Sequence, residues 1–217
     1  HIKANTGMNR FGFDLPAFRA FAAGRLCGNV SAEGIYSHFY RPEHAETAAR
    51  QFSLFGEFCR EGERAFGKLI RHIAATGGTI ASPDYRLDMV RIGIGLYGYL
   101  PGGFAGALPL KRALTVCSTV AAVRECAGGG AGYGEFGPVY GRLAAVRAGY
   151  ADGFSRAGGV GNVNVLCMDA FLSRIPAEKY AEMCVFSDAD AYAERNGTIS
   201  YEALTRVCGR AERVYEG

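Results

Sequence analysis

A lysine near the start of the sequence and a glycine series in its middle are the first features that could do chemistry. Lys3, in "HIKANTG", is a candidate for a lysine that binds a carbonyl cofactor, because an amine can add to a carbonyl group. Gly93, Gly95 and Gly98 match the spacing of a dinucleotide-binding fingerprint, which requires a helix directly after the glycines. The sequence "PGG" at 101–103 follows instead and disfavours dinucleotide binding. Glycines at a strand end can still let backbone N–H groups approach a phosphate.

The composition indicates a folded protein that handles small molecules. A chain of 217 residues with 49% hydrophobic content can bury a substantial core. The formal charge of +3 is spread over 24 basic and 21 acidic residues without a basic run, so we expect no nucleic-acid or membrane partner. The seven cysteines form no C-x-x-C pair, which favours reduced thiols in a cytoplasmic protein.

One uncharged stretch, residues 92–110, is nearly as long as a membrane span. Six glycines and two prolines lie within it, so a strand followed by a linker explains it better than a membrane helix.

The elements that would position these residues fall into two parts. In the first part we expect strands at 1–4, 34–39, 70–74 and 89–96, which alternate with helical patterns. One helix is expected at 15–23, and a second carries apolar residues at helical spacing between 45 and 58. Such β/α alternation predicts a parallel sheet or barrel. After Pro109 the β-branched runs predict a mainly β domain, with helical periodicity only at 201–208, so we place the domains at 1–108 and 109–217.

Seven blocks of the sequence resemble, in the same order, those of the alanine racemases, which are fold-type III enzymes that use pyridoxal phosphate. The resemblance covers essentially the whole chain, and the blocks are "HIKANTGMNRFGF", "GIYSHF", "DMVRIGIGLYGY", "GYGEF", "AGYADG", "CMD" and "TISYE". It implies the C-terminal part of a (β/α)8 TIM-type barrel followed by a mainly β domain. It also implies a head-to-tail homodimer in which each active site takes residues from both subunits. The reaction implied is racemisation of L-alanine to D-alanine for the bacterial cell wall.

The resemblance answers the question about Lys3. In this family the lysine that binds the cofactor stands in K-A-N-A-Y-G-H-G, whereas Lys3 is followed by "TGMNR". Lys3 therefore matches a second lysine, which many members carbamylate and which steadies the neighbouring Arg10. The contexts of Lys68, Lys111 and Lys179 do not match a cofactor site either. We expect that the first barrel strands and the catalytic lysine are absent from this sequence, and that the chain as printed binds pyridoxal phosphate poorly.

Racemisation requires two acid–base groups on opposite faces of the substrate. By resemblance, Tyr133 of "AGYGEF" is the group opposite the lysine. Its ordinary pKa of about 10 is too high for a base, so a neighbouring cation must favour the phenolate. Arg10 and His38 match the candidates for that cation. From the sequence alone, Tyr133 could equally be an exposed tyrosine in a glycine turn.

Arg91 of "DMVR" matches the arginine that donates a hydrogen bond to the pyridine nitrogen. Because arginine keeps its proton, that nitrogen would stay uncharged, which should suppress competing transamination. Without the resemblance, Arg91 could instead cap a strand or pair with Asp88. The phosphate contacts of the family match the hydroxyl of Thr76, the N–H groups of Gly93 and Ile94, and the hydroxyl of Tyr201. The Ala75-Thr76 pair departs from the usual Asn-Ser, but the hydroxyl is kept.

Tyr150 and Met168 match residues that shape the substrate entrance and carboxylate site from the partner subunit, and Arg10 matches a substrate contact. Met168 could also be core filler. His72 matches a barrel-strand histidine and could equally be a buried structural one. The stretch 156–167 is short for the family, and "NVNVL" replaces the usual "IVGR" before "CMD", so we expect part of the β domain to be either deleted or missing from the recorded sequence.

Three functional hypotheses remain open from the sequence. The first is an alanine racemase with no metal. The second is a non-catalytic relative that serves as a binding or assembly module, and the third is the racemase domain of a membrane-attached serine racemase. Retention of Arg10, Arg91, Tyr133 and Tyr201 together favours the enzyme. We place alanine ahead of serine as substrate, because serine-acting relatives tend to replace the tyrosine that matches Tyr201.

Overall fold

The computed structural model of the chain describes residues 1–133, 138–157, 160, 165–207 and 209–215. The chain divides into two compact units, His1–Lys111 and Arg112–Gly217. Their positions relative to one another are not determined, so each unit is described by itself.

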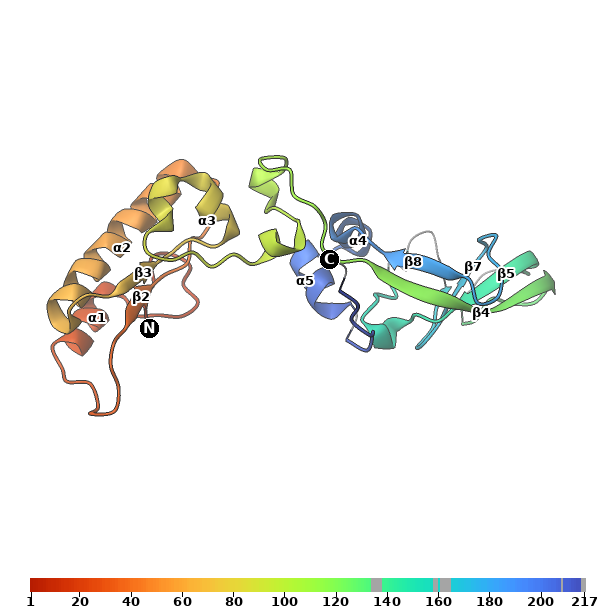
Figure 1. The fold of residues 1–217 in the computed structure, drawn as a ribbon, viewed down its shortest axis with the longest axis horizontal. Coiled ribbons are helices and arrows are strands. Elements are labelled where there is room, and N and C mark those ends of the chain that lie inside the picture. Colours follow the sequence, from red (N-terminus) through yellow and green to blue (C-terminus); the bar gives the residue numbers. More distant parts are fainter. Residues whose placement is uncertain (134–137, 158–159, 161–164, 208, 216–217) are drawn as a thin grey trace. The chain divides into compact units, whose positions relative to one another are not determined.

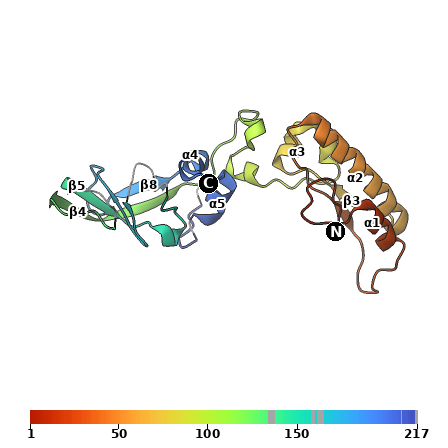
Figure 2. The same ribbon diagram turned by 180° about the vertical axis from the view of Figure 1, so that it is seen from behind.

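The first unit is built on a parallel three-stranded sheet in the order β1-β2-β3. Its strands are short, and they are β1 (Ile2–Lys3), β2 (Gly34–Tyr36) and β3 (Ile70–His72). Helix α1 (Leu15–Ala22) connects β1 to β2, and α2 (Ala45–Phe66) connects β2 to β3. Both helices lie alongside the sheet in the two opposite views of Figures 1 and 2. This β/α alternation is part of a β/α barrel, as the sequence predicts.

Local sequence explains where these helices form. The side chain of Asp14 accepts a hydrogen bond from Ala17 N at 2.8 Å, which caps the start of α1, and a proline occupies its first turn. Helix α2 buries Phe55 and Phe58 against the sheet residue Ile35, and all three are almost fully buried. Burying such side chains is the main stabilising term for these helices, each side chain contributing about 1.5–3 kcal/mol.

The segment after β3 is less regular than predicted. It contains α3 (Thr76–Ala81) and three 3-10 turns, η1 (Pro83–Arg86), η2 (Ile94–Tyr97) and η3 (Gly102–Phe104). The strand predicted at 89–96 is therefore wrong. Only an isolated parallel bridge between Ala75 and Arg91 continues the sheet pattern. The backbone of Gly93, with φ −114° and ψ −96°, then leaves the extended conformation and starts η2.

The second unit is an antiparallel sheet in the order β6-β7-β5-β4-β8, which confirms the predicted β domain. Strand β4 is the longest and pairs with β5 on one side and β8 on the other. The strands are β4 (Val116–Ala127), β5 (Tyr140–Val146), β6 (Val165–Leu166), β7 (Phe171–Ser173) and β8 (Glu182–Phe186).

Two helices and one 3-10 turn complete this unit: α4 (Ala189–Asn196), α5 (Ser200–Arg206) and η4 (Tyr150–Asp152). Helices α4 and α5 lie at the same end of the sheet in both views (Figures 1 and 2). Helix α5 falls where helical periodicity is predicted, whereas α4 is not predicted. Its signals are local, with Asp188 capping its start and Gly197 in a left-handed conformation at its end.

The described residues contain no helix long and apolar enough to cross a membrane. In the stretch 92–110, which resembles a span by its composition, the regular structure is limited to 3-10 turns.

Candidate functional site

Arg91 is the best-anchored polar side chain at the end of the parallel sheet. Its Nη2 donates a hydrogen bond to the backbone oxygen of Ser37 at 2.6 Å, and its Nη1 lies 2.5 Å from Nδ1 of His72. The guanidinium also lies over the ring of Tyr36, 5.4 Å from the ring centroid. Burial lowers the pKa of Arg91, but an arginine in this setting still keeps its proton. Arg91 is therefore a fixed hydrogen-bond donor.

The alternative pairing of Arg91 with Asp88 is wrong. The carboxylate of Asp88 accepts hydrogen bonds from Arg71, including one of 2.8 Å from Nε. These bonds lower the pKa of Asp88 to about 2. The cation that pairs with Asp88 is therefore Arg71 and not Arg91.

His72 holds Arg91 from the neighbouring strand. Since a guanidinium only donates, Nδ1 of His72 must carry the lone pair and its proton must be on Nε2. That nitrogen lies 2.7 Å from Nδ1 of His1, to which it donates. The imidazole is 4% exposed and stacks on Tyr36, and burial is the first cause that lowers its pKa to about 4. His72 is therefore neutral at physiological pH.

The contact between His1 and His72 depends on a glycine in the strand between them. A Cβ atom at Gly34 would lie 2.6 Å from Nδ1 of His1 and 2.8 Å from the backbone oxygen of Ile70. Both distances are too short for any side chain. Gly34 thus leaves room for the ring of His1 to reach across β2.

Two backbone N–H groups converge on one hydroxyl next to Arg91. The amides of Gly93 and Gly95 donate to Oγ1 of Thr76 at 3.2 and 3.3 Å. Because the Thr76 oxygen accepts from both amides, its hydroxyl proton is left to donate to an anion. A Cβ atom at Gly93 would meet nothing within 4 Å, so there is open space on that side. The arrangement suits a phosphate group.

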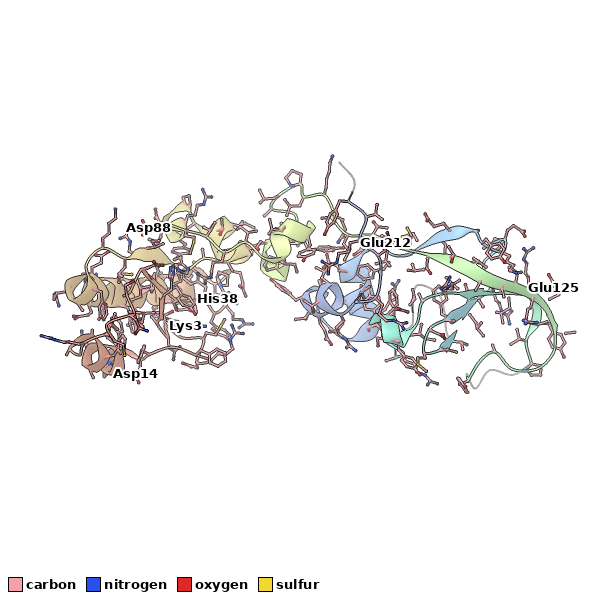
Figure 3. The ribbon with its side chains drawn as sticks, turned by 60° about the horizontal axis from the view of Figure 1, so that its bottom comes forward. Lys3, Asp14, His38, Asp88, Glu125 and Glu212 are labelled. Atoms are coloured by element: carbon pink, nitrogen blue, oxygen red, sulfur yellow. The ribbon has the colours of Figure 1, made fainter. Side chains whose placement is uncertain are left out.

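Lys3, Arg10 and His38 influence one another electrostatically on the first unit. Figure 3 shows Lys3 and His38 near one another. The pKa of Lys3 is lowered by burial first and then by Arg10 and Arg91, while its Nζ lies 5.4 Å from the ring centroid of Tyr36. The pKa of His38 is lowered by burial and by the same arginines. A lowered pKa favours the neutral form of His38 at physiological pH.

In the second unit, the backbone at Gly132, next to the predicted residue Tyr133, and the backbone of the predicted residue Tyr150 both lie close to Cys167. A Cβ atom at Gly132 would lie 3.2 Å from Sγ of Cys167, which places the Tyr133 turn against that residue. The backbone N of Tyr150 donates to Cys167 O at 3.0 Å. The Tyr133 side chain is 82% exposed within its unit, so its phenol faces away from that unit's core.

Met168 and Tyr201 are also largely exposed in the second unit. The Met168 side chain is 58% exposed, so the alternative of core filler is wrong. Its backbone oxygen accepts a hydrogen bond from Ala151 N at 2.8 Å, which joins the "CMD" and "AGYADG" blocks. Tyr201 lies on α5, and partial burial raises its pKa, so its hydroxyl is a neutral donor. Residues 161–164 of the "NVNVL" block lie outside the described residues.

Known families match both units. The family model for the alanine racemase N-terminal domain matches residues 1–101, and that for the alanine racemase C-terminal domain matches residues 113–215. The chain belongs to the alanine racemase family. Members of this family use pyridoxal 5'-phosphate as cofactor.

Individual relatives agree with the family models. The alanine racemase of Beutenbergia cavernae is 34% identical over the whole chain and 66% of its own length, and that of Chlorobaculum tepidum is 34% identical over 98% of the chain and 62% of its own length. The solved alanine racemase of Clostridium difficile 630 has a TM-score of 0.86 at 28% identity and covers all of the chain and 64% of the solved chain. That of Streptomyces coelicolor A3(2) has a TM-score of 0.84 at 29% identity, covering 98% and 65%. The chain thus spans between 62% and 66% of the length of these relatives, which is less than two thirds in each case.

The residues present fit the family's cofactor. The Thr76 hydroxyl, which accepts from the N–H groups of Gly93 and Gly95, can donate its own proton to a phosphate, and a fixed donor, Arg91, lies two residues before Gly93 along the chain. Sequence reasoning finds Thr76, Gly93 and Arg91, but it misses His1 and the role of Gly34. The one signal for them is the pair of histidines: His72 lies on β3, and His1 directly precedes β1, which is separated from β3 by β2.

Proposed function

We propose that the natural protein that contains these residues racemises alanine with pyridoxal phosphate. The observation that carries this proposal is the fixed Arg91 guanidinium on the same unit as the Thr76 hydroxyl, which accepts from the N–H of Gly93. A protein that only binds a partner has no use for a half-buried arginine whose donors are directed by a neutral histidine. The alanine racemase of Bacillus anthracis has been solved with bound L-Ala-P, which supports alanine as the substrate class for this chain.

Separate groups of the chain would bind the phosphate and the ring nitrogen of the cofactor. The hydroxyl of Thr76, the N–H groups of Gly93 and Ile94, and the hydroxyl of Tyr201 would bind its phosphate. Arg91 would donate to its ring nitrogen and keep that nitrogen uncharged. When bound, pyridoxal phosphate withdraws electrons and makes the α-proton of an amino acid acidic.

We assign the proton transfer on one face of the substrate to Tyr133. Its exposed phenol can enter a site outside its own unit, and a cation near its oxygen would favour the phenolate. Arg10 is proposed as that cation and as a contact for the substrate carboxylate. The acid–base group on the opposite face is proposed to be a lysine in a segment of the natural protein outside these residues.

We propose that Lys3 is carbamylated. In carbamylation the neutral amine adds to the carbon of dissolved carbon dioxide, one C=O π bond becomes the carboxylate, and one amine proton is released to solvent; burial together with Arg10 lowers the pKa of Lys3 toward the neutral form that this requires. The resulting carbamate would be an anion next to Arg10 and would orient its guanidinium. Tyr150 and Met168 are proposed to shape the substrate entrance from the partner subunit of a head-to-tail homodimer in the cytoplasm. The D-alanine formed would supply the bacterial cell wall.

The competing proposal is a non-catalytic relative. It predicts that the natural protein binds no pyridoxal phosphate and does not racemise. The decisive experiment incubates the natural protein with pyridoxal phosphate and L-alanine, and measures D-alanine formation together with the visible absorbance of bound cofactor. Absence of both signals would establish the non-catalytic alternative.

A tyrosine variant tests the proposed role of Tyr133. Tyr133→Phe should lower kcat by about 100-fold or more, the usual scale for losing one acid–base group. Proton exchange with deuterated solvent should survive for the enantiomer whose proton is taken on the lysine face. Tyr180→Phe is the matched control, since Tyr180 is 73% exposed in the same unit and should leave activity unchanged. Equal loss of exchange from both enantiomers would remove Tyr133 from this role.

A further inference from the structure

Cys117 of β4 and Cys184 of β8 are directly opposite one another in the antiparallel sheet of the second unit. On one side of the pair the register is regular, with Ser118 opposite Met183 and Thr119 opposite Glu182, whereas on the other side it shifts by one residue, so that Val116 lies opposite Phe186. Both cysteines are exposed, while Val116 and Val185, the residues adjacent to them in sequence, are buried. Directly opposed residues point to the same face of a sheet, so both thiols lie together on the outer face.

The hydrogen-bond pattern places this pair at a close-approach position. The N–H of Val120 donates to Ala181 O at 3.0 Å, and Val120 O accepts from Tyr180 N at 2.7 Å, so both backbone groups of Val120 face the chain that leads into β8, although the two bonds go to adjacent residues. Hydrogen-bonded and non-hydrogen-bonded sites alternate along an antiparallel pair. Cys117, three residues away, is therefore at a non-hydrogen-bonded site, where Cα atoms are about 4.5 Å apart. A disulfide spans Cα separations of about 4.4–6.8 Å.

The other described cysteines lack this arrangement. Cys59 is buried, and burial raises its pKa to about 12, which keeps its thiol unreactive. Cys126 and Cys167 are half-buried and pack against an apolar cluster. Cys27 is exposed in the segment between α1 and β2. Cys208 lies outside the described residues.

We propose that Cys117 and Cys184 are a reversible redox pair that forms a cross-strand disulfide with a small disulfide oxidant. The thiolate of one cysteine attacks a sulfur of the oxidant and releases one thiol, which leaves a mixed disulfide. The thiolate of the second cysteine then displaces the second thiol and forms the protein disulfide. Two protein thiols are oxidised, one oxidant disulfide is reduced, and the two thiol protons end on the two released thiols.

The position of β8 gives this bond a mechanical consequence. Strand β8 is at the edge of the sheet and pairs only with β4 among the described strands. The chain continues from β8 into α4 and α5, and α5 carries Tyr201. A disulfide between Cys117 and Cys184 would link β8 covalently to β4 and would limit how far the two strands can separate. The pair is a regulatory site distinct from the residues assigned to racemisation.

The test uses the reduced natural protein, oxidised glutathione and peptide mapping by mass spectrometry without reduction. The expected product is a peptide pair linked through Cys117 and Cys184, with loss of two hydrogen atoms from the protein, and dithiothreitol should reverse it. In Cys117→Ser and Cys184→Ser, the remaining cysteine should instead carry one glutathione. Cys126→Ser is the matched control and should still form the linkage.

Two outcomes would overturn the proposal. One is a wild-type protein in which both cysteines stay as thiols after other exposed thiols have reacted. The other is a wild-type protein in which each cysteine keeps its own glutathione, because a second thiol at about 4.5 Å between Cα atoms should displace it.

Discussion

Nη1 of Arg91 lies 2.5 Å from Nδ1 of His72, and this contact determines which proton His72 carries. The guanidinium can only donate, so His72 accepts at Nδ1 and donates from Nε2 to His1. The side chains of Arg91, His72 and His1 thus form a row of hydrogen bonds in which each side chain donates to the next. The orientation of Arg91 then depends on a neutral, buried histidine that does not need to touch the cofactor.

His72 is therefore a positioning residue, and two substitutions separate this role from simple packing. His72→Phe removes the acceptor and should weaken binding of pyridoxal phosphate by about 10- to 100-fold, the scale of one hydrogen bond to a charged group. His72→Asn keeps an acceptor near Nδ1 and should restore most of the affinity. An absorbance titration of the natural protein with cofactor measures both. If the two variants lose affinity equally, His72 only fills space.

Gly34→Ala tests the space that β2 leaves for His1. The new Cβ would lie 2.6 Å from Nδ1 of His1 and 2.8 Å from Ile70 O, so ring and strand must both shift. Overpacking of this kind costs about 1–3 kcal/mol in the free energy of unfolding. Denaturant unfolding measures it, with Gly28→Ala as control, because a Cβ at Gly28 meets nothing within 4 Å. An unchanged free energy for Gly34→Ala would contradict the close approach.

The depressed pKa of His72 predicts that the free energy of unfolding decreases as the pH falls from about 6.5 to about 4. An unfolded histidine binds a proton below about pH 6.5, whereas folded His72 does so only near 4. Between these values the unfolded state holds more protons, so the free energy of unfolding decreases as the pH falls from 6.5 toward 4. His38 contributes with the same sign, since its pKa is also lowered. Protonation of the Asp88 carboxyl lowers the free energy of unfolding only below about pH 4, because its pKa in the folded state is about 2.

The midpoints of unfolding at pH 7 and pH 4.5 measure the slope of the free energy of unfolding against pH. The slope should be shallower in His72→Asn, which has no imidazole to protonate. An identical slope in the variant and the parent protein would show that other groups control acid stability.

Much of the fold could be predicted because its signals are local. Asp14 and the proline that follows it mark the start of α1, and the apolar spacing marks α2. The strand predicted at 89–96 fails because apolar character alone does not show that Gly93 turns the chain into a 3-10 turn. The His1–His72 contact joins residues 71 positions apart and depends on Gly34 lacking a side chain, so no local pattern indicates it.

Dilution tests the proposed shared site. If Tyr133, Tyr150 and Met168 act from the partner subunit, specific activity should fall when the protein concentration falls below the dissociation constant of the dimer. Assays across a dilution series, with an inert carrier protein to prevent adsorption, follow this loss. Reconcentration should restore the activity. A monomer shown by sedimentation to keep full specific activity would exclude the shared site.

The preference between alanine and serine tests the part of the proposal that concerns Tyr201 and Met168. Tyr201 is retained where serine-acting relatives tend to carry a smaller polar residue, and its ring would leave room for a methyl group while crowding a hydroxymethyl group. The thioether of Met168 offers a substrate hydroxyl little hydrogen bonding. An unpaired buried hydroxyl costs about 1–3 kcal/mol, so kcat/KM should favour L-alanine over L-serine by roughly 10- to 100-fold. Tyr201→Asn should narrow this ratio, whereas Tyr180→Asn should not. A parent protein that prefers serine would show that the pocket argument is wrong, and an unchanged ratio in Tyr201→Asn would assign the discrimination to another residue.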